Sequence, residues 1–310
     1  MFMPDATADL LRLQISLFLM ITVGFFAAKS GLIDKAGRKI LSDLSFKILL
    51  PCNILKSYLG EIDMEVLHSC LFLLLLAVAM ELFCMLLNCF LYNQQSPEHK
   101  RLMQYMTVCS NSGFLGAGIT QGLYGDLGLL YNSVYMIPMR IFMWTVGMSY
   151  FTKKITGRDL IRNVFLHPCL LSLYLGLILM LTQHTLPYAL SHVVNSFGNC
   201  MVPVAMLVTG TILADMRLKE LINRSTFLIS AIRLLILPAI TLLCAHLLPL
   251  DTTARGVAVL LSGMPAATVT VLFATQYDGD AAFATKCVVL TTLLSVVTIP
   301  VWSLVMLTIG

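Results

Sequence analysis

Two short polar or helix-breaking runs interrupt otherwise apolar stretches of this 310-residue chain. Their members are Ser110, Asn111, Ser112, Gly113, Met264, Pro265 and Ala266. Glycine and proline weaken or break a helix, and inside a bilayer a broken backbone is tolerated only where it is buried in protein or lines a cavity. Each break also presents the start of a new helix, whose free N–H groups attract anions. Because Asn111 and the two serines add neutral donors, the two runs predict a site for a carboxylate.

Four further residues are candidates for the same site or for steering charge towards it. Asn53 and Asn199 lie in apolar stretches, within about one helical turn of Pro51 and Pro203 respectively. They are predicted to form the wall of the substrate site, with helix–helix hydrogen bonding as the alternative. Glu81 and Arg140 lie deep in apolar stretches, where charge is costly and usually functional. They either neutralise each other, or Glu81 takes a proton or cation while Arg140 steers an anion.

The other four charged residues inside apolar stretches are expected to have structural roles. Asp43 and Lys47 are four residues apart on a predicted helix and are expected to pair. Arg233 and Lys286 lie near the predicted cytoplasmic ends of their helices, so they are expected to extend their charged heads to the membrane surface.

Other kinds of chemistry find little support. The chain has no nucleotide-binding G-x-x-x-x-G-K-[ST] loop and no H-E-x-x-H pair. Its nine cysteines contain no C-x-x-C spacing, and no histidine, cysteine or acidic cluster has the spacing of a metal site. We therefore expect no cofactor, no metal and no enzymatic activity.

Composition identifies the solvent for most of the chain. Hydrophobic residues make up 58% and charged residues 12%, against about 45–50% and about 25% in soluble domains. The net charge of +4 is too small and dispersed for nucleic-acid binding. At roughly 20 residues a crossing, the chain has room for about ten helices. We predict spans 1 to 10 at residues 9–28, 40–59, 66–92, 101–122, 127–151, 161–182, 188–213, 226–248, 254–276 and 281–308.

The two halves of the chain repeat one another. An offset of 152 residues relates Gly24 to Gly176 and Pro51 to Pro203, and it also relates Asp63-Met64 to Asp215-Met216. With five spans in each half, the second half must enter the membrane from the opposite side. The sequence thus predicts inverted repeats at 1–155 and 156–310, a design typical of secondary transporters. Spans 4 and 9, which carry the two interruptions, should then cross near the midplane.

The distribution of basic residues predicts the orientation. Most loop lysines and arginines follow spans 1, 3, 5 and 7, which places those loops in the cytoplasm and both termini outside. The expected location is the plasma membrane, crossed many times.

The chain resembles a known family of transporters. The run Ser110–Gly116 (SNSGFLG), the run Gly263–Ala266 (GMPA), the segment ending in Leu50-Pro51 and the 5+5 layout are similar to the auxin efflux carrier family. That family includes the plant PIN auxin exporters and bacterial carriers of malate, malonate and other organic acids. Asn111 and Pro265 match residues of its two helix breaks, whereas Ser110 stands where plant members have a proline.

This resemblance implies a fold and a mechanism. Spans 1, 2, 6 and 7 would form a scaffold, and spans 3–5 and 8–10 a transport domain that moves like an elevator. The scaffold would also form a homodimer. The function expected is secondary transport of a small organic anion such as malate, malonate or an auxin-like acid, across a lipid bilayer. The alternatives are a proton- or sodium-coupled carrier of another solute and, from another class, an intramembrane enzyme or a non-transporting sensor.

Overall fold

A computed structural model describes residues 4–59, 64–151, 168–182, 184, 186–214, 222–277 and 279–309. Throughout these residues the secondary structure is helical, apart from one isolated antiparallel bridge between Ser110 and Ala266. The all-α fold class is confirmed. Asp63, Asp215 and Met216 of the repeat pattern lie outside the described residues.

Helices occupy the regions where spans were predicted. In the first half they are α1 (Pro4–Lys29), α2 (Lys35–Leu44), the π-helical turn η1 (Ser45–Leu49), α3 (Leu50–Lys56), α4 (Met64–Phe90), α5 (Pro97–Val108), the π-helical turn η2 (Ser112–Gly116), α6 (Ala117–Trp144) and α7 (Val146–Ser149). In the second half they are α9 (Pro168–Thr182), α10 (Tyr188–Ala214), α11 (Arg224–Ala231), the π-helical turn η4 (Ile232–Ile236), α12 (Leu237–His246), α13 (Thr252–Ser262), α14 (Val269–Gln276) and α15 (Ala281–Ile309).

Several of these helices have the dimensions of membrane spans. Among the described residues, four are long and apolar enough to cross a bilayer: Met64–Phe90, Tyr188–Ala214, Arg224–His246 and Ala281–Ile309. Many of their large apolar side chains are exposed, including Leu82, Leu86 and Val297. A lipid environment explains this exposure, because in water such surfaces would be unfavourable.

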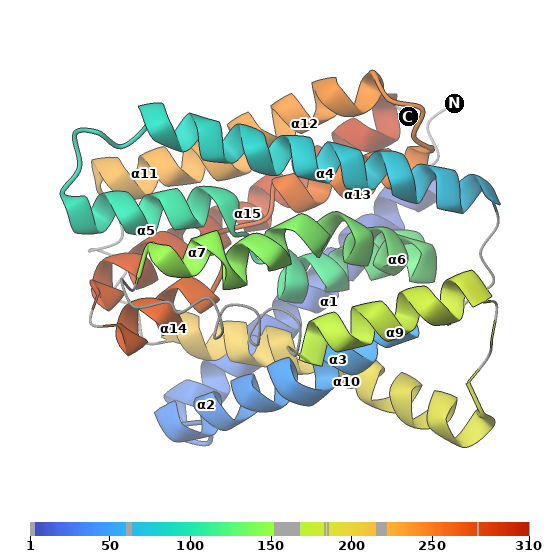
Figure 1. Ribbon diagram of the computed structural model, residues 1–310. Coiled ribbons are helices and arrows are strands. Elements are labelled where there is room, and N and C mark those ends of the chain that lie inside the picture. The colour runs from blue at the N-terminus through green and yellow to red at the C-terminus, as the bar shows by residue number, and fades with distance from the viewer. Residues whose placement is uncertain are drawn as a thin grey trace. The chain divides into compact units, whose positions relative to one another are not determined.

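The chain divides into two compact units. Unit 1 comprises residues 1–68, 113–133 and 165–215, and unit 2 comprises 69–112, 134–164 and 216–310. In unit 1, α1 packs along α10, and α3 packs against both α10 and α9 (Figure 1). Gly24 and Gly176 stand at two of these contacts: a Cβ on Gly24 would overlap the Leu207 carbonyl, and one on Gly176 would meet the Tyr58 ring. Small residues therefore set these helix separations.

Unit 2 packs α11, α13 and α14 against α15, and α12 against α13. Side chains satisfy the starts of its helices, as at α13, where the Asp251 carboxylate accepts from the Ala254 N–H. Asp280 does the same for α15 by accepting from the Phe283 N–H, and it also contacts His99 Nε2 at 3.0 Å. The predicted pairing of Asp43 with Lys47, in unit 1, is confirmed at 3.6 Å between two exposed side chains.

Candidate functional site

The two polar runs lie at breaks in the helices, and the breaks pair with each other in unit 2. Helix α5 ends at Val108, and Cys109 is extended with φ −87° and ψ 120°. Helix α13 ends at Ser262, and α14 begins at Val269. The Asn111 N–H donates to the Pro265 carbonyl at 2.8 Å, and the Ala267 N–H donates to the Cys109 carbonyl at 3.2 Å. These two bonds satisfy backbone groups that no longer belong to a helix.

The polar side chains of the first break differ in how far they are satisfied. The Ser110 and Ser112 hydroxyls lie 2.5 Å apart, and Ser112 donates to the Leu261 carbonyl at 3.1 Å. The side chain of Asn111 is buried, and its Nδ2 donor has no hydrogen-bond partner among the described residues. Burying an amide donor without a partner is unfavourable. The break therefore contains a buried side-chain donor, Asn111 Nδ2, that no described residue uses.

Arg233 joins the carboxyl ends of the two broken helices. Its Nη1 donates to the Thr107 carbonyl at 2.9 Å, and its Nη2 and Nε donate to the Met264 carbonyl at 3.0 and 3.3 Å. Only 3% of the residue is exposed. The prediction that Arg233 extends to the membrane surface was wrong. Helix carboxyl ends carry partial negative charge and carbonyls without an intrahelical partner. The guanidinium of Arg233 therefore turns inward to these carbonyls and does not extend to the membrane surface.

A local irregularity accompanies this orientation of Arg233. Residue Pro238 lacks an N–H, so it cannot donate to the carbonyl four residues earlier, at Leu234. The helix forms the π-turn η4 just before it, with the Leu237 N–H reaching back to the Ile232 carbonyl. The Leu234 carbonyl is satisfied instead by the indole N–H of Trp302 on α15, at 2.8 Å. Arg233 thus stands in a turn of a kind that is common at functional sites.

A cavity of about 40 Å³ adjoins the breaks. Its polar lining comes from Glu81, Ser110, Ser112, Tyr135, Arg233 and Ser262. Such a volume holds about three water molecules, or the carboxylate end of a larger molecule. Glu81 Oε1 is buried and has no hydrogen-bond partner in the described part of the chain. One cavity is therefore lined by an acidic residue, a basic residue and three serines.

The other predicted site residues are distributed as follows. Met264 contributes its carbonyl to Arg233, and the Ala266 N–H donates to Thr291 Oγ1 at 3.1 Å. Arg140 is buried on α6, donates to Met136 Sδ at 3.8 Å and is not among the cavity-lining residues.

Three predicted residues belong to unit 1: Gly113, Asn53 and Asn199. Asn53 is buried, and neither atom of its amide has a hydrogen-bond partner among the described residues. Asn199 is exposed and accepts from Lys56. Unit 2 therefore brings together six of the nine predicted substrate residues, with Glu81.

Comparison with known proteins identifies the family. The family model described as membrane transport protein matches residues 11–163 and 154–303. The chain belongs to this family. It is the auxin efflux carrier family that the sequence resembles, so that prediction is confirmed.

Three relatives agree with this placement. An uncharacterized transporter of Methanothermobacter thermautotrophicus is 30% identical over 63% of this chain, and the match spans 65% of that relative's length, just under two thirds. An uncharacterized transporter of Methanocaldococcus jannaschii is 22% identical over 93% of this chain and 96% of its own length. A protein of Rhizobium meliloti described as a candidate malonate transporter is 22% identical over 94% of each chain. Membership of a membrane transport family agrees with the four long apolar helices among the described residues, and together they indicate a multi-pass membrane protein.

Proposed function

We propose that this protein is a secondary transporter of a small organic anion, such as malonate, malate or an auxin-like acid. The substrate carboxylate binds where the breaks of spans 4 and 9 cross, with Asn111 Nδ2 as its principal side-chain donor. The observation that carries this proposal is the buried Asn111 Nδ2, which has no hydrogen-bond partner among the described residues and lies where two broken helices pair. Arg233 donates to the Met264 carbonyl at the second break, and its positive charge makes the electrostatic potential there more favourable for an anion.

A ten-span architecture of two inverted repeats goes with this function. Helix packing in unit 1 supports it, because α1 lies on α10 and α9 lies on α3. A two-fold axis in the membrane plane would exchange α1 with α9 and α10 with α3, so it would convert one of these helix pairs into the other. Gly24 and Gly176, which stand at the two contacts, are related by the same 152-residue offset.

The mechanism proposed is alternating access with elevator-like movement. The division of the chain into two units supports it, since unit 1 holds spans 1, 2, 6 and 7 of the proposed scaffold. Residues 113–133, around the junction of spans 4 and 5, cluster with unit 1 rather than with the transport domain. We further propose a homodimer formed through the scaffold, in the plasma membrane, with both termini outside.

A coupled version of the same transport is favoured by one observation. Glu81 lines the same cavity as Arg233, and its Oε1 is buried without a hydrogen-bond partner in the described part of the chain. A carboxylate oxygen buried without a hydrogen bond is costly, so Glu81 favours taking up a proton or a sodium ion. Imposed pH and sodium gradients should then change the rate of uptake, and Glu81→Gln should abolish that change.

The experiment is uptake of labelled malonate, malate and indole-acetate into proteoliposomes. Asn111→Ala should raise KM about ten- to hundred-fold, because a hydrogen bond to a charged group contributes about 1.5–3 kcal/mol. Asn111→Asp should abolish uptake, because it places negative charge at the anion site. Asn93→Ala, at an exposed asparagine beyond α4, is the control and should transport normally. Uptake by Asn111→Ala at the wild-type KM would remove the crossing from the mechanism.

A further inference from the structure

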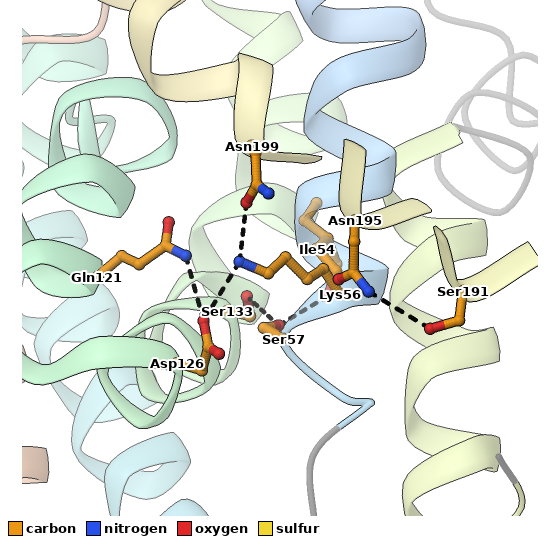
Figure 2. Close-up of polar contacts among 9 residues, drawn as sticks. All are labelled: Ile54, Lys56, Ser57, Gln121, Asp126, Ser133, Ser191, Asn195 and Asn199. Atoms are coloured by element: carbon orange, nitrogen blue, oxygen red, sulfur yellow. Dashed lines mark hydrogen bonds and ion pairs between the residues drawn. The ribbon is translucent and has the colours of Figure 1, made fainter. Parts of the chain in front are cut away.

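Lys56 connects three segments of unit 1 at a place that the proposed crossing does not use. It is the last residue of α3, and its Nζ donates to Asn199 Oδ1 on α10 at 3.0 Å (Figure 2). The same Nζ lies 3.4 Å from Asp126 Oδ1 on α6. Only 15% of the Lys56 side chain is exposed. An ammonium group buried to this extent is stable only with an anion and further acceptors around it.

Asp126 is weakly held. Its side chain is 73% exposed, and it follows Gly125, whose φ of +64° interrupts α6. An exposed carboxylate loses little by turning into water, and ion pairs with such groups contribute about 0–1 kcal/mol. The mostly buried Lys56 has no comparable freedom. The pair is therefore asymmetric: the cation is fixed, and the anion is exchangeable.

Two donors converge on a single oxygen of Asp126. Lys56 Nζ and Gln121 Nε2, the latter at 3.2 Å, both point to Oδ1 (Figure 2). Asn195, one turn before Asn199 on α10, is not one of these donors, because its Nδ2 donates to Ser191 Oγ (Figure 2). The geometry is that of a carboxylate site already occupied by a carboxylate from the same chain.

The cation is held in place by its own helix end. Ser57 Oγ donates to the Ile54 carbonyl at 2.7 Å and lies 3.2 Å from Ser133 Oγ (Figure 2). On the other side, α10 approaches α3 closely, because a Cβ on Gly198 would lie 3.3 Å from Asn53 Cα. With the end of α3 held on two sides, the backbone position of Lys56 does not depend on Asp126, and Asn199 Oδ1 still accepts from its Nζ when Asp126 leaves.

We propose that Lys56, with Gln121 and Asn199, forms an anion-binding subsite for the carboxylate of the transported acid, and that Asp126 is its tethered competitor. This inference rests on the proposed function and adds a second residue set that determines affinity for acids. The incoming carboxylate takes the place of Asp126 Oδ1, and Asp126 turns into water.

The test compares the two partners of the pair. Asp126→Asn keeps the shape but removes the competing charge, so the KM for malonate should fall about two- to five-fold, the range that an exposed ion pair of up to about 1 kcal/mol allows. Lys56→Gln removes the cation, so KM should rise about ten-fold or more, and Lys56→Arg should restore most of the affinity. Lys47→Gln and Asp43→Asn break another ion pair of unit 1 and should leave KM unchanged.

The sign of the two effects separates this proposal from a structural role. A pair that only fastened α6 to α3 would give KM shifts in the same direction for Asp126→Asn and Lys56→Gln, and that result overturns the inference, as does no shift in either. Vesicles of phosphatidylcholine alone and vesicles containing phosphatidylglycerol distinguish a soluble acid from a lipid phosphate. If Lys56→Gln alters uptake only with the anionic lipid, the subsite binds lipid and the proposal is wrong.

Failure of the proposed function gives a different result. In that case the wild-type protein takes up none of the acids, whatever the state of Lys56. Thermal stabilisation by malonate in detergent then decides the inference separately, because Asp126→Asn should be stabilised at lower malonate concentration than wild type. If wild type and Asp126→Asn reached half of their stabilisation at the same malonate concentration, the inference would be wrong.

Discussion

Replacing Arg233 by methionine tests whether one buried side chain holds the two broken helices together. Methionine keeps an unbranched apolar stem of similar reach but donates no hydrogen bond. The change removes the donors to the carbonyls of Thr107 and Met264 and leaves both acceptors buried. It also removes the basic group that shares a cavity with Glu81.

The size of the effect follows from these lost contacts. Each buried carbonyl left without a donor costs about 1–3 kcal/mol, so the two together cost about 2–6 kcal/mol. Relief of the guanidinium's own desolvation offsets part of this cost. We expect a net destabilisation of about 3 kcal/mol. Arg233→Lys should lose less, because an ammonium group keeps the charge but does not reproduce the fork that reaches both carbonyls.

The assay is thermal unfolding in detergent, followed by malonate uptake at a temperature where every variant is folded. Arg224→Met is the matched control, since Arg224 is exposed at the start of the same helical segment. Relative to that control, Arg233→Met should unfold several degrees lower and show a reduced maximal rate of uptake. Equal unfolding temperatures and equal rates for Arg233→Met and Arg224→Met would refute the assignment.

Three further changes probe separate contacts. Trp302→Phe leaves the Leu234 carbonyl without its indole donor and should lower stability by about 1–3 kcal/mol, measured by thermal unfolding. Gly24→Leu forces a side chain into the backbone of α10 and should sharply reduce the yield of monodisperse protein in size-exclusion chromatography. Although burial acts to raise it, hydrogen bonds from the start of α15 and from His99 hold the pKa of Asp280 below its ordinary value. Its stabilisation should therefore be present at pH 6 and disappear as the pH falls below about 4, a loss that Asp280→Asn should not show.

The helices and their interruptions were predictable from the sequence because their causes are local. Apolar stretches of sufficient length predicted helices near the observed bounds, including α4 and α15. Polar and glycine residues around Asn111, and Pro265 in the second run, predicted the ends of α5 and α13, since a missing N–H or a flexible backbone acts within one turn. The family was also recognisable from these motifs.

The partners of the charged side chains depend on tertiary structure. Arg233 reaches carbonyls 31 and 126 residues away, and Lys56 meets Asn199 across 143 residues of sequence. Sequence alone placed Arg233 near a membrane surface, and the only local signal for its different environment was the proline that follows it at Pro238. Local pattern determines where a helix begins and breaks, whereas helix rotation and packing determine which distant carbonyl or carboxylate a buried cation meets. For that reason the two helix breaks were predicted from the sequence, but the arginine that joins them was not.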